Sequence, residues 1–146
     1  MGAVVFPTQG LVALDSAPLI YIVEQHPVYL PHLAPLWKAA EEGDLTLVIS
    51  ELALSEALVL PLRQANQTMI DAYGLVAEKS GIRVEPVSWR FLRRSAELRA
   101  QRPGLRMPDA IHVATADLTE CDVFLTNDKS LRSVPLPSVV VLDDLI

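Results

Sequence analysis

The sequence contains a single cysteine, Cys121, among its 146 residues. One cysteine excludes an intramolecular disulfide framework and is typical of proteins from a reducing compartment. With only three scattered histidines, the chain also shows no zinc-ligand spacing. No apolar run reaches the roughly 18 residues that would span a bilayer, and the start of the chain lacks the features of a secretory signal. We therefore expect a cytoplasmic protein with no membrane association.

Aromatic residues are also scarce, at 5% of the chain, whereas apolar residues make up 51%. That apolar content is enough for the core of one ordinary domain, and no linker or repeat divides the chain. We predict a single domain over residues 1–146, in which residues 1–10 form an N-terminal extension whose role the sequence does not reveal. The apolar content also favours a partner, such as a second copy of the chain, that covers part of the surface.

Positive charge is in deficit overall, with 12 Lys and Arg against 18 Asp and Glu and a net charge of −6. This balance argues against a general nucleic-acid binder. The charge is unevenly distributed, however, because residues 83–106 contain seven arginines and two glutamates, a net +5, which leaves −11 for the remainder. This arginine-rich segment is either a solvated helix face or a surface that contacts phosphates, and the sequence leaves both open.

Short apolar runs alternate with longer helical patterns along the chain. Strands are predicted near 11–15, 45–49, 83–87, 122–126 and 138–142, and helices near 18–25, 29–42, 51–64, 67–79, 89–101 and 108–118. This alternation is typical of an α/β domain with a mainly parallel sheet, here of four to five strands. Ser50 is expected to cap the helix that follows it, and Pro61 to kink or end that helix.

Four acidic residues lie in apolar stretches where an isolated charge is costly. Asp15 ends the run LVALD, Glu56 interrupts VISELALSEALVLPL, Asp109 opens MPDAIHVATAD, and Asp128 follows VFLTN. Carboxylates are rarely buried unless they are paired, hydrogen-bonded or bound to a metal.

Connectivity places these four acids on one side of the predicted sheet. Asp15 and Asp128 follow strands, and the C-terminal ends of parallel strands meet at the edge where ligands gather. Asp109 lies in the first turn of a helix that starts at that edge, and Glu56 lies about 9 Å along its own helix. The helix face that carries Glu56 is expected to pack inward. The same face carries Leu52, Ala53, Val59 and Leu60.

Taken singly, three of these acids have ordinary structural explanations. Asp15 and Asp128 are suitable cap or turn residues, and Asp109 complements a helix dipole. Taken together, the four acids are better explained as one site for a hard divalent cation such as Mg²⁺ or Mn²⁺, which prefers carboxylate oxygens. Such a site usually performs phosphoryl transfer, because the metal activates water and stabilises charge on phosphate oxygens.

Four sequence blocks resemble those of the PIN-domain nucleases, and most closely those of the VapC-type toxins of toxin–antitoxin modules. The blocks are LDSAPLIY (14–21), SELALSEALVLPLR (50–63), MPDAIHVATA (107–116) and LTNDKSL (125–131), and they occur in the order of the family. The resemblance implies an α/β/α sandwich and a Mg²⁺- or Mn²⁺-dependent endoribonuclease that cleaves RNA. It also implies a homodimer and an antitoxin protein that fills the active-site groove.

The resemblance assigns roles by position. The acidic quartet of the family corresponds to Asp15, Glu56, Asp109 and Asp128, which are therefore the predicted catalytic and metal-binding residues. The expected supporting residues around these ligands are Ser16, which stands where the family usually has Thr, Thr126 and Asn127. The candidate contacts for RNA or for the antitoxin are Arg90, Arg93, Arg94 and Arg106.

Other residues near these motifs receive structural interpretations. His112 follows Asp109 by three positions, and a packed structural histidine is favoured over a general base. Trp89, Phe91 and Leu92 are expected to anchor the arginine-rich helix to the core.

Two alternatives to the nuclease are considered. The first alternative is a catalytically silent PIN-like module that only binds RNA or a protein. An aspartyl-nucleophile phosphatase is disfavoured, because Ala17 stands where its second Asp belongs.

Overall fold

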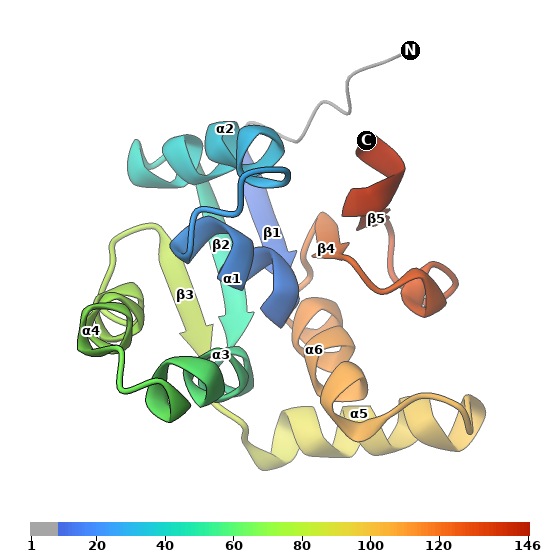
Figure 1. The fold of residues 1–146 in the computed structure, drawn as a ribbon. Helices are drawn as coiled ribbons and strands as arrows, with labels where there is room; N and C mark the ends of the chain where they lie inside the picture. The colour runs from blue at the N-terminus through green and yellow to red at the C-terminus, as the bar shows by residue number, and fades with distance from the viewer. Residues whose placement is uncertain (1–8) are drawn as a thin grey trace.

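The computed structural model describes residues 9–146 and contains one parallel β-sheet with helices on both faces (Figure 1). The sheet is made of β1 (Gly10–Leu14), β2 (Leu45–Ser50), β3 (Ile82–Glu85), β4 (Val123–Thr126) and β5 (Val139–Val141). The strand order is β3-β2-β1-β4-β5, with every neighbouring pair parallel. Gly10 already belongs to the sheet, and residues 1–8 of the predicted N-terminal extension lie outside the described residues.

Within residues 9–146, six α-helices connect and cover the strands. They are α1 (Ser16–Val23), α2 (Leu30–Glu41), α3 (Glu51–Arg63), α4 (Gln67–Val76), α5 (Trp89–Gln101) and α6 (Met107–Leu118). Two short 3-10 helices follow near the C-terminus, η1 (Lys129–Leu131) and η2 (Leu142–Leu145). Within residues 9–146, no helix is both long and apolar enough to cross a bilayer.

The central strands divide their side chains between two apolar cores. Val12 and Leu14 of β1 belong to a core shared with α1 and α2, whereas Ala13 belongs to a second core shared with α5 and α6. In β4, Leu125 and Phe124 divide in the same way, because successive strand residues point to opposite faces. This arrangement confirms the predicted α/β/α sandwich with a central parallel sheet, and the number of strands is five, the upper end of the predicted four to five.

The direction of the strand order reverses at β1. The chain passes from β1 outward to β2 and β3, then returns to place β4 and β5 on the other side of β1. The C-terminal ends of β1 and β4 are adjacent, since Leu14 pairs with Leu125 and the Asp15 N–H donates to the Leu125 carbonyl at 2.9 Å. Ligand sites in open parallel sheets form at such a reversal. The residues that follow β1 and β4 therefore occupy the expected place for a site.

The predicted helix signals are present, with one shift in position. Ser50 caps α3, since its hydroxyl accepts a hydrogen bond from the Leu52 N–H at 3.2 Å. Pro61 lies in the last turn of α3, which ends two residues later. Asp15 is the N-cap of α1 rather than a strand residue, with φ −67° and ψ 168°. Helix α1 consequently begins at Ser16, earlier than the predicted residue 18.

The prediction that Trp89 anchors α5 is wrong, because its side chain is 75% exposed. The buried face of α5 is formed by Phe91, Ser95 and Leu98, which recur at intervals of three and four residues. Trp89 precedes Phe91 by two residues and so points away from that face. Phe91 does anchor the helix, as predicted, since it is buried.

The prediction that the Glu56 face of α3 packs inward is wrong for its C-terminal half. Val59 and Leu60 are 44% and 52% exposed. The buried residues of α3 are Ala53, Ala57 and Pro61, so the buried face is rotated relative to the predicted one. Glu56 therefore lies at the border of the buried face, where its carboxylate is partly exposed.

Candidate active site

Asp15 is held in place by the end of the neighbouring strand. Its Oδ2 accepts a hydrogen bond from the Thr126 hydroxyl at 2.8 Å, and its Oδ1 accepts one from the Ser16 N–H at 2.8 Å. Asp15 is only 6% exposed, and Thr126 is fully buried. The Thr126 hydroxyl also accepts from the Asp128 N–H at 3.0 Å. One buried threonine thus links the acid after β1 to the acid after β4.

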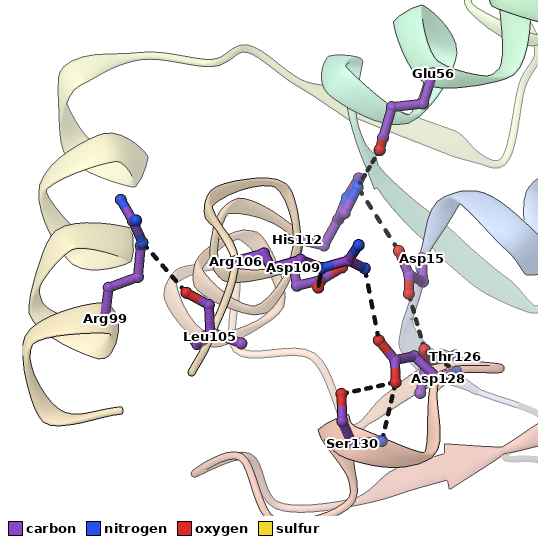
Figure 2. Close-up of polar contacts among 10 residues, drawn as sticks. All are labelled: Asp15, Glu56, Arg99, Leu105, Arg106, Asp109, His112, Thr126, Asp128 and Ser130. Atoms are coloured by element: carbon purple, nitrogen blue, oxygen red, sulfur yellow. Dashed lines mark hydrogen bonds and ion pairs between the residues drawn. The ribbon is translucent and has the colours of Figure 1, made fainter. Parts of the chain in front are cut away.

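Glu56 reaches the site through His112. The Nε2 atom of His112 lies 2.6 Å from Oε1 of Glu56 and 3.6 Å from Oδ1 of Asp15 (Figure 2). His112 is 2% exposed, whereas the side chain of Glu56 is 35% exposed. The imidazole therefore stands between α3 and the end of β1 and brings a partly exposed carboxylate toward a buried one.

Arg106 connects the other two acids of the quartet. Its Nε donates to Oδ2 of Asp109 at 3.0 Å, and its Nη2 lies 3.9 Å from Oδ2 of Asp128 (Figure 2). Asp109 is in the first turn of α6, as predicted, and its side chain is 13% exposed. Oδ1 of Asp128 accepts hydrogen bonds from both the N–H and the hydroxyl of Ser130, at 2.9 and 2.7 Å.

One run of polar contacts thus joins the whole acidic quartet. It passes from Glu56 through His112 to Asp15, through Thr126 to Asp128, and through Arg106 to Asp109. The four acids come from α3, α6 and the ends of β1 and β4, as connectivity predicts. The roles predicted for His112 and Arg106 did not include these links.

The electrostatics of the site follow from this crowding. Burial raises the pKa of Asp109, and the charges of Asp15 and Asp128 add to the rise, although the hydrogen bond from Arg106 opposes it. Burial by itself lowers the pKa of His112. The hydrogen bond to Glu56 and the charges of Asp15, Glu56 and Asp109 outweigh burial, so the pKa of His112 is raised above its usual value.

The four arginines named as candidate contacts divide into two groups. Arg94 pairs with Asp117 at 2.7 Å and with Glu97, Arg90 donates to the Leu118 carbonyl, and Arg93 lies 3.6 Å from Glu97. These contacts fasten α5 to α6 or lie within α5. Arg106 alone among the four touches the acidic quartet. Its position three residues before Asp109, at the start of a helix, is the signal by which this contact is recognisable in the sequence.

The supporting residues are also placed unequally. Thr126 contacts the quartet through its side chain, and Ser16 does so through its backbone N–H. Asn127 instead donates to the Tyr21 hydroxyl at 3.2 Å and accepts from the Asp143 N–H at 3.0 Å. Asn127 therefore ties the C-terminal η2 to α1, and among residues 9–146 it makes no hydrogen bond to the quartet.

A pocket of about 320 Å³ lies beside the quartet and is lined in part by Arg106, Asp109 and Ser130. A larger, apolar hollow of about 850 Å³ is bordered by α1, α2 and α4, with Ile22, Trp37 and Leu75 in its wall. The larger hollow contains none of the four acids. Charge and hydrogen bonding, rather than size, therefore favour the smaller pocket as the candidate site.

The donor set fits a hard divalent cation, since Asp15, Asp109 and Asp128 offer only oxygen and the first two are nearly buried. Within residues 9–146, no three Asp, Glu, His or Cys side chains converge closely enough to hold a metal as they stand. The contacts explain why: Arg106 lies between Asp109 and Asp128, and Glu56 is engaged by His112.

Solved structures with the same fold include three from bacteria. VapBC2 from Rickettsia felis, bound to a DNA fragment from the promoter, matches with a TM-score of 0.69 and 18% identity over 90% of this chain and 98% of that chain. A toxin–antitoxin complex from Klebsiella pneumoniae matches with a TM-score of 0.60 and 21% identity, over 90% of this chain and 97% of that chain. VapC20 from Mycobacterium tuberculosis, a Sarcin-Ricin loop cleaving toxin, matches with a TM-score of 0.70 and 14% identity, over 86% of this chain and 95% of that chain.

Comparison with curated protein sequences gives no match. The sequence does match the PIN domain family over residues 12–136, a range that includes the whole acidic quartet. This match confirms the family to which the four sequence blocks pointed. The chain belongs to the PIN domain family.

Proposed function

We propose that this protein is a metal-dependent endoribonuclease that acts as the toxin of a toxin–antitoxin pair in the cytoplasm. The observation that carries the proposal is the intact acidic quartet, joined by one run of polar contacts at the strand-order reversal of a PIN domain. PIN domains are a family of nucleases. A silent binding module would have no need to bring four acids from four different elements into one run of polar contacts.

The proposed roles follow from burial and contacts. Asp15, Asp109 and Asp128 would hold Mg²⁺ or Mn²⁺, and Glu56 would complete the pocket or position water. When bound, the ion supplies an activated water and neutralises charge on the phosphate. Thr126 fixes the orientation of Asp15, and His112 fixes that of Glu56. Arg106, with its exposed guanidinium at the mouth of the site, is the candidate contact for an RNA phosphate.

The substrate and partners are supported by what the similar structures are. VapC20 is described as a toxin that cleaves the Sarcin-Ricin loop, which is RNA, and two of the similar structures are toxin–antitoxin complexes. We extend both properties to this chain as part of the proposal. The homodimer belongs to it as well, and the exposed apolar residues of α3 and α5, Val59, Leu60, Leu62 and Trp89, support a covered surface.

Cleavage of a panel of structured and single-stranded RNAs by the purified protein tests the proposal. We expect cutting with Mg²⁺ or Mn²⁺ and none with EDTA. RNA that is bound but uncut under every metal would instead support the silent module. Size-exclusion chromatography with light scattering tests the homodimer, and a monomer would contradict it.

A further inference from the structure

Each acid of the quartet that faces the pocket already has a cationic or hydrogen-bonding partner in the metal-free protein. The guanidinium of Arg106 is the one placed where a metal would have to sit, since it lies between the carboxylates of Asp109 and Asp128 (Figure 2). Its Nε contacts Asp109 at 3.0 Å, and its Nη2 lies 3.9 Å from Asp128. While it is there, those two carboxylates are directed at a single positive charge rather than at a shared ion.

The position of Arg106 makes this contact easy to break. Its side chain is 75% exposed and belongs to the N-cap residue of α6, outside the helix itself. Exposed ion pairs contribute little stability, because solvent screens the charges and ordering the side chains costs entropy. A divalent ion carries twice the charge and binds carboxylate oxygens directly, so it outcompetes one guanidinium for the same pair of acids.

The structure also offers room for the displaced side chain. The pocket of about 320 Å³ next to Asp109 is bounded by Arg102, Leu105, Arg106, Ser130 and Val134. Arg102 and Arg99 are themselves fixed, since Arg102 hydrogen-bonds to Ser133 and Arg99 to the Leu105 carbonyl. Within residues 9–146, Arg106 is therefore the arginine at this pocket whose polar partners are all acids of the site.

We propose that Arg106 is a resident counter-cation, which occupies the place of the metal between Asp109 and Asp128 and is displaced when the divalent ion binds. The inference rests on the proposed function, because it concerns the metal site of that nuclease. The exchange orders the events at the site: the ion binds first, and its binding releases the guanidinium toward an incoming RNA phosphate. In the absence of metal, the same arginine lowers the repulsion among Asp15, Asp109 and Asp128.

The test compares Mn²⁺ binding by calorimetry, without RNA, in the wild-type chain and in Arg106→Gln. We expect Arg106→Gln to bind Mn²⁺ roughly two- to fivefold more tightly at low salt, because the competing charge is gone. The gain should shrink as salt rises, since screening weakens the exposed ion pair. Arg106→Lys should fall between the two, because it keeps the charge but loses the planar fork.

Arg132→Gln is the matched control, because it removes the same charge four residues from Asp128. In the described part of the chain, Arg132 pairs with Asp144 and makes no ion pair or hydrogen bond with the quartet. Its Mn²⁺ affinity should equal that of the wild type. If Arg132→Gln tightened binding as much as Arg106→Gln, general electrostatics would account for the gain and the proposal would fall.

A second readout follows Arg106 itself. The Nε–H resonance of Arg106 in the wild-type chain should move when diamagnetic Mg²⁺ is added, as the hydrogen bond to Asp109 is lost. Equal Mn²⁺ affinity in wild type and Arg106→Gln, with a stationary Arg106 resonance, would overturn the exchange and leave the metal site standing. If no form of the protein bound Mn²⁺, both the exchange and the metal dependence of the proposed nuclease would be overturned.

Discussion

The imidazole of His112 and the carboxylate of Glu56, 56 residues apart in the sequence, meet at 2.6 Å between Nε2 and Oε1. The same Nε2 lies 3.6 Å from Asp15, so one buried ring stands between two acids of the quartet. Among the described residues, the Nδ1 atom of His112 has no hydrogen-bond partner. All of the polar interaction of this ring is thus directed at the acidic site, which makes His112 a positioning residue.

The pH dependence of stability should report this pairing in metal-free protein. The pKa of His112 is raised in the fold, so the folded state holds the proton more tightly than the unfolded chain does. The stabilisation is therefore fully present below the unfolded pKa of about 6.5 and is lost as pH rises through the raised folded value. This stabilisation is measured by urea unfolding of the wild type and His112→Gln in EDTA at a series of pH values. The stability advantage of wild type should be largest below about pH 6.5 and should shrink as the pH rises above that value. An advantage that grows with pH would contradict the assignment.

Thr126→Val should destabilise the fold although it preserves shape. The Thr126 side chain is fully buried, and its hydroxyl both donates to Asp15 and accepts from the Asp128 N–H. Removing it leaves the buried Asp15 carboxylate oxygen and the partly buried Asp128 N–H without this partner, which costs about 1–3 kcal/mol of the free energy of unfolding. Chemical denaturation measures this loss. Thr68→Val, at an exposed position of α4, is the control and should change stability by less than about 0.5 kcal/mol.

Added Mg²⁺ should raise the thermal midpoint of the wild-type protein and raise that of Asp109→Asn much less. An ion that binds only the folded state stabilises it, by about 2.7 kcal/mol at a hundred times the dissociation constant. Asp109 is a nearly buried carboxylate in the proposed ligand set, so replacing it with Asn should weaken the binding of Mg²⁺. Differential scanning fluorimetry measures the thermal midpoint of both proteins with added Mg²⁺ and with EDTA. An equal Mg²⁺-dependent shift in both proteins would remove Asp109 from the proposed ligand set.

The part of the site that the sequence predicts is the part set by chain connectivity. Asp15, Asp109 and Asp128 each adjoin the end of a strand or the start of a helix, and parallel topology brings these ends to one edge. The alternating apolar runs likewise predict the five parallel strands, with boundaries displaced by a few residues. Asp15 shows why they are displaced: its side chain caps α1, so the strand ends one residue earlier.

The contacts that the sequence does not predict depend on helix rotation and packing. The buried face of α3 is set by Ala53, Ala57 and Pro61, and only that rotation brings Glu56 to His112. Trp89 is exposed for the same kind of reason, since Phe91 fixes the orientation of α5. Periodicity alone does not decide among neighbouring faces of a helix that is rich in apolar residues.

The central claim is that the acidic quartet cleaves RNA, and it is tested most directly by the cleavage rate of Asp15→Asn beside Asp44→Asn. Asp44 is exposed in the turn between α2 and β2, away from the quartet, so the control removes the same charge without touching the site. With saturating Mg²⁺ or Mn²⁺, the account predicts that Asp15→Asn loses at least about a hundredfold in rate while Asp44→Asn cleaves as the wild type does. Cleavage by Asp15→Asn at the wild-type rate would contradict the account.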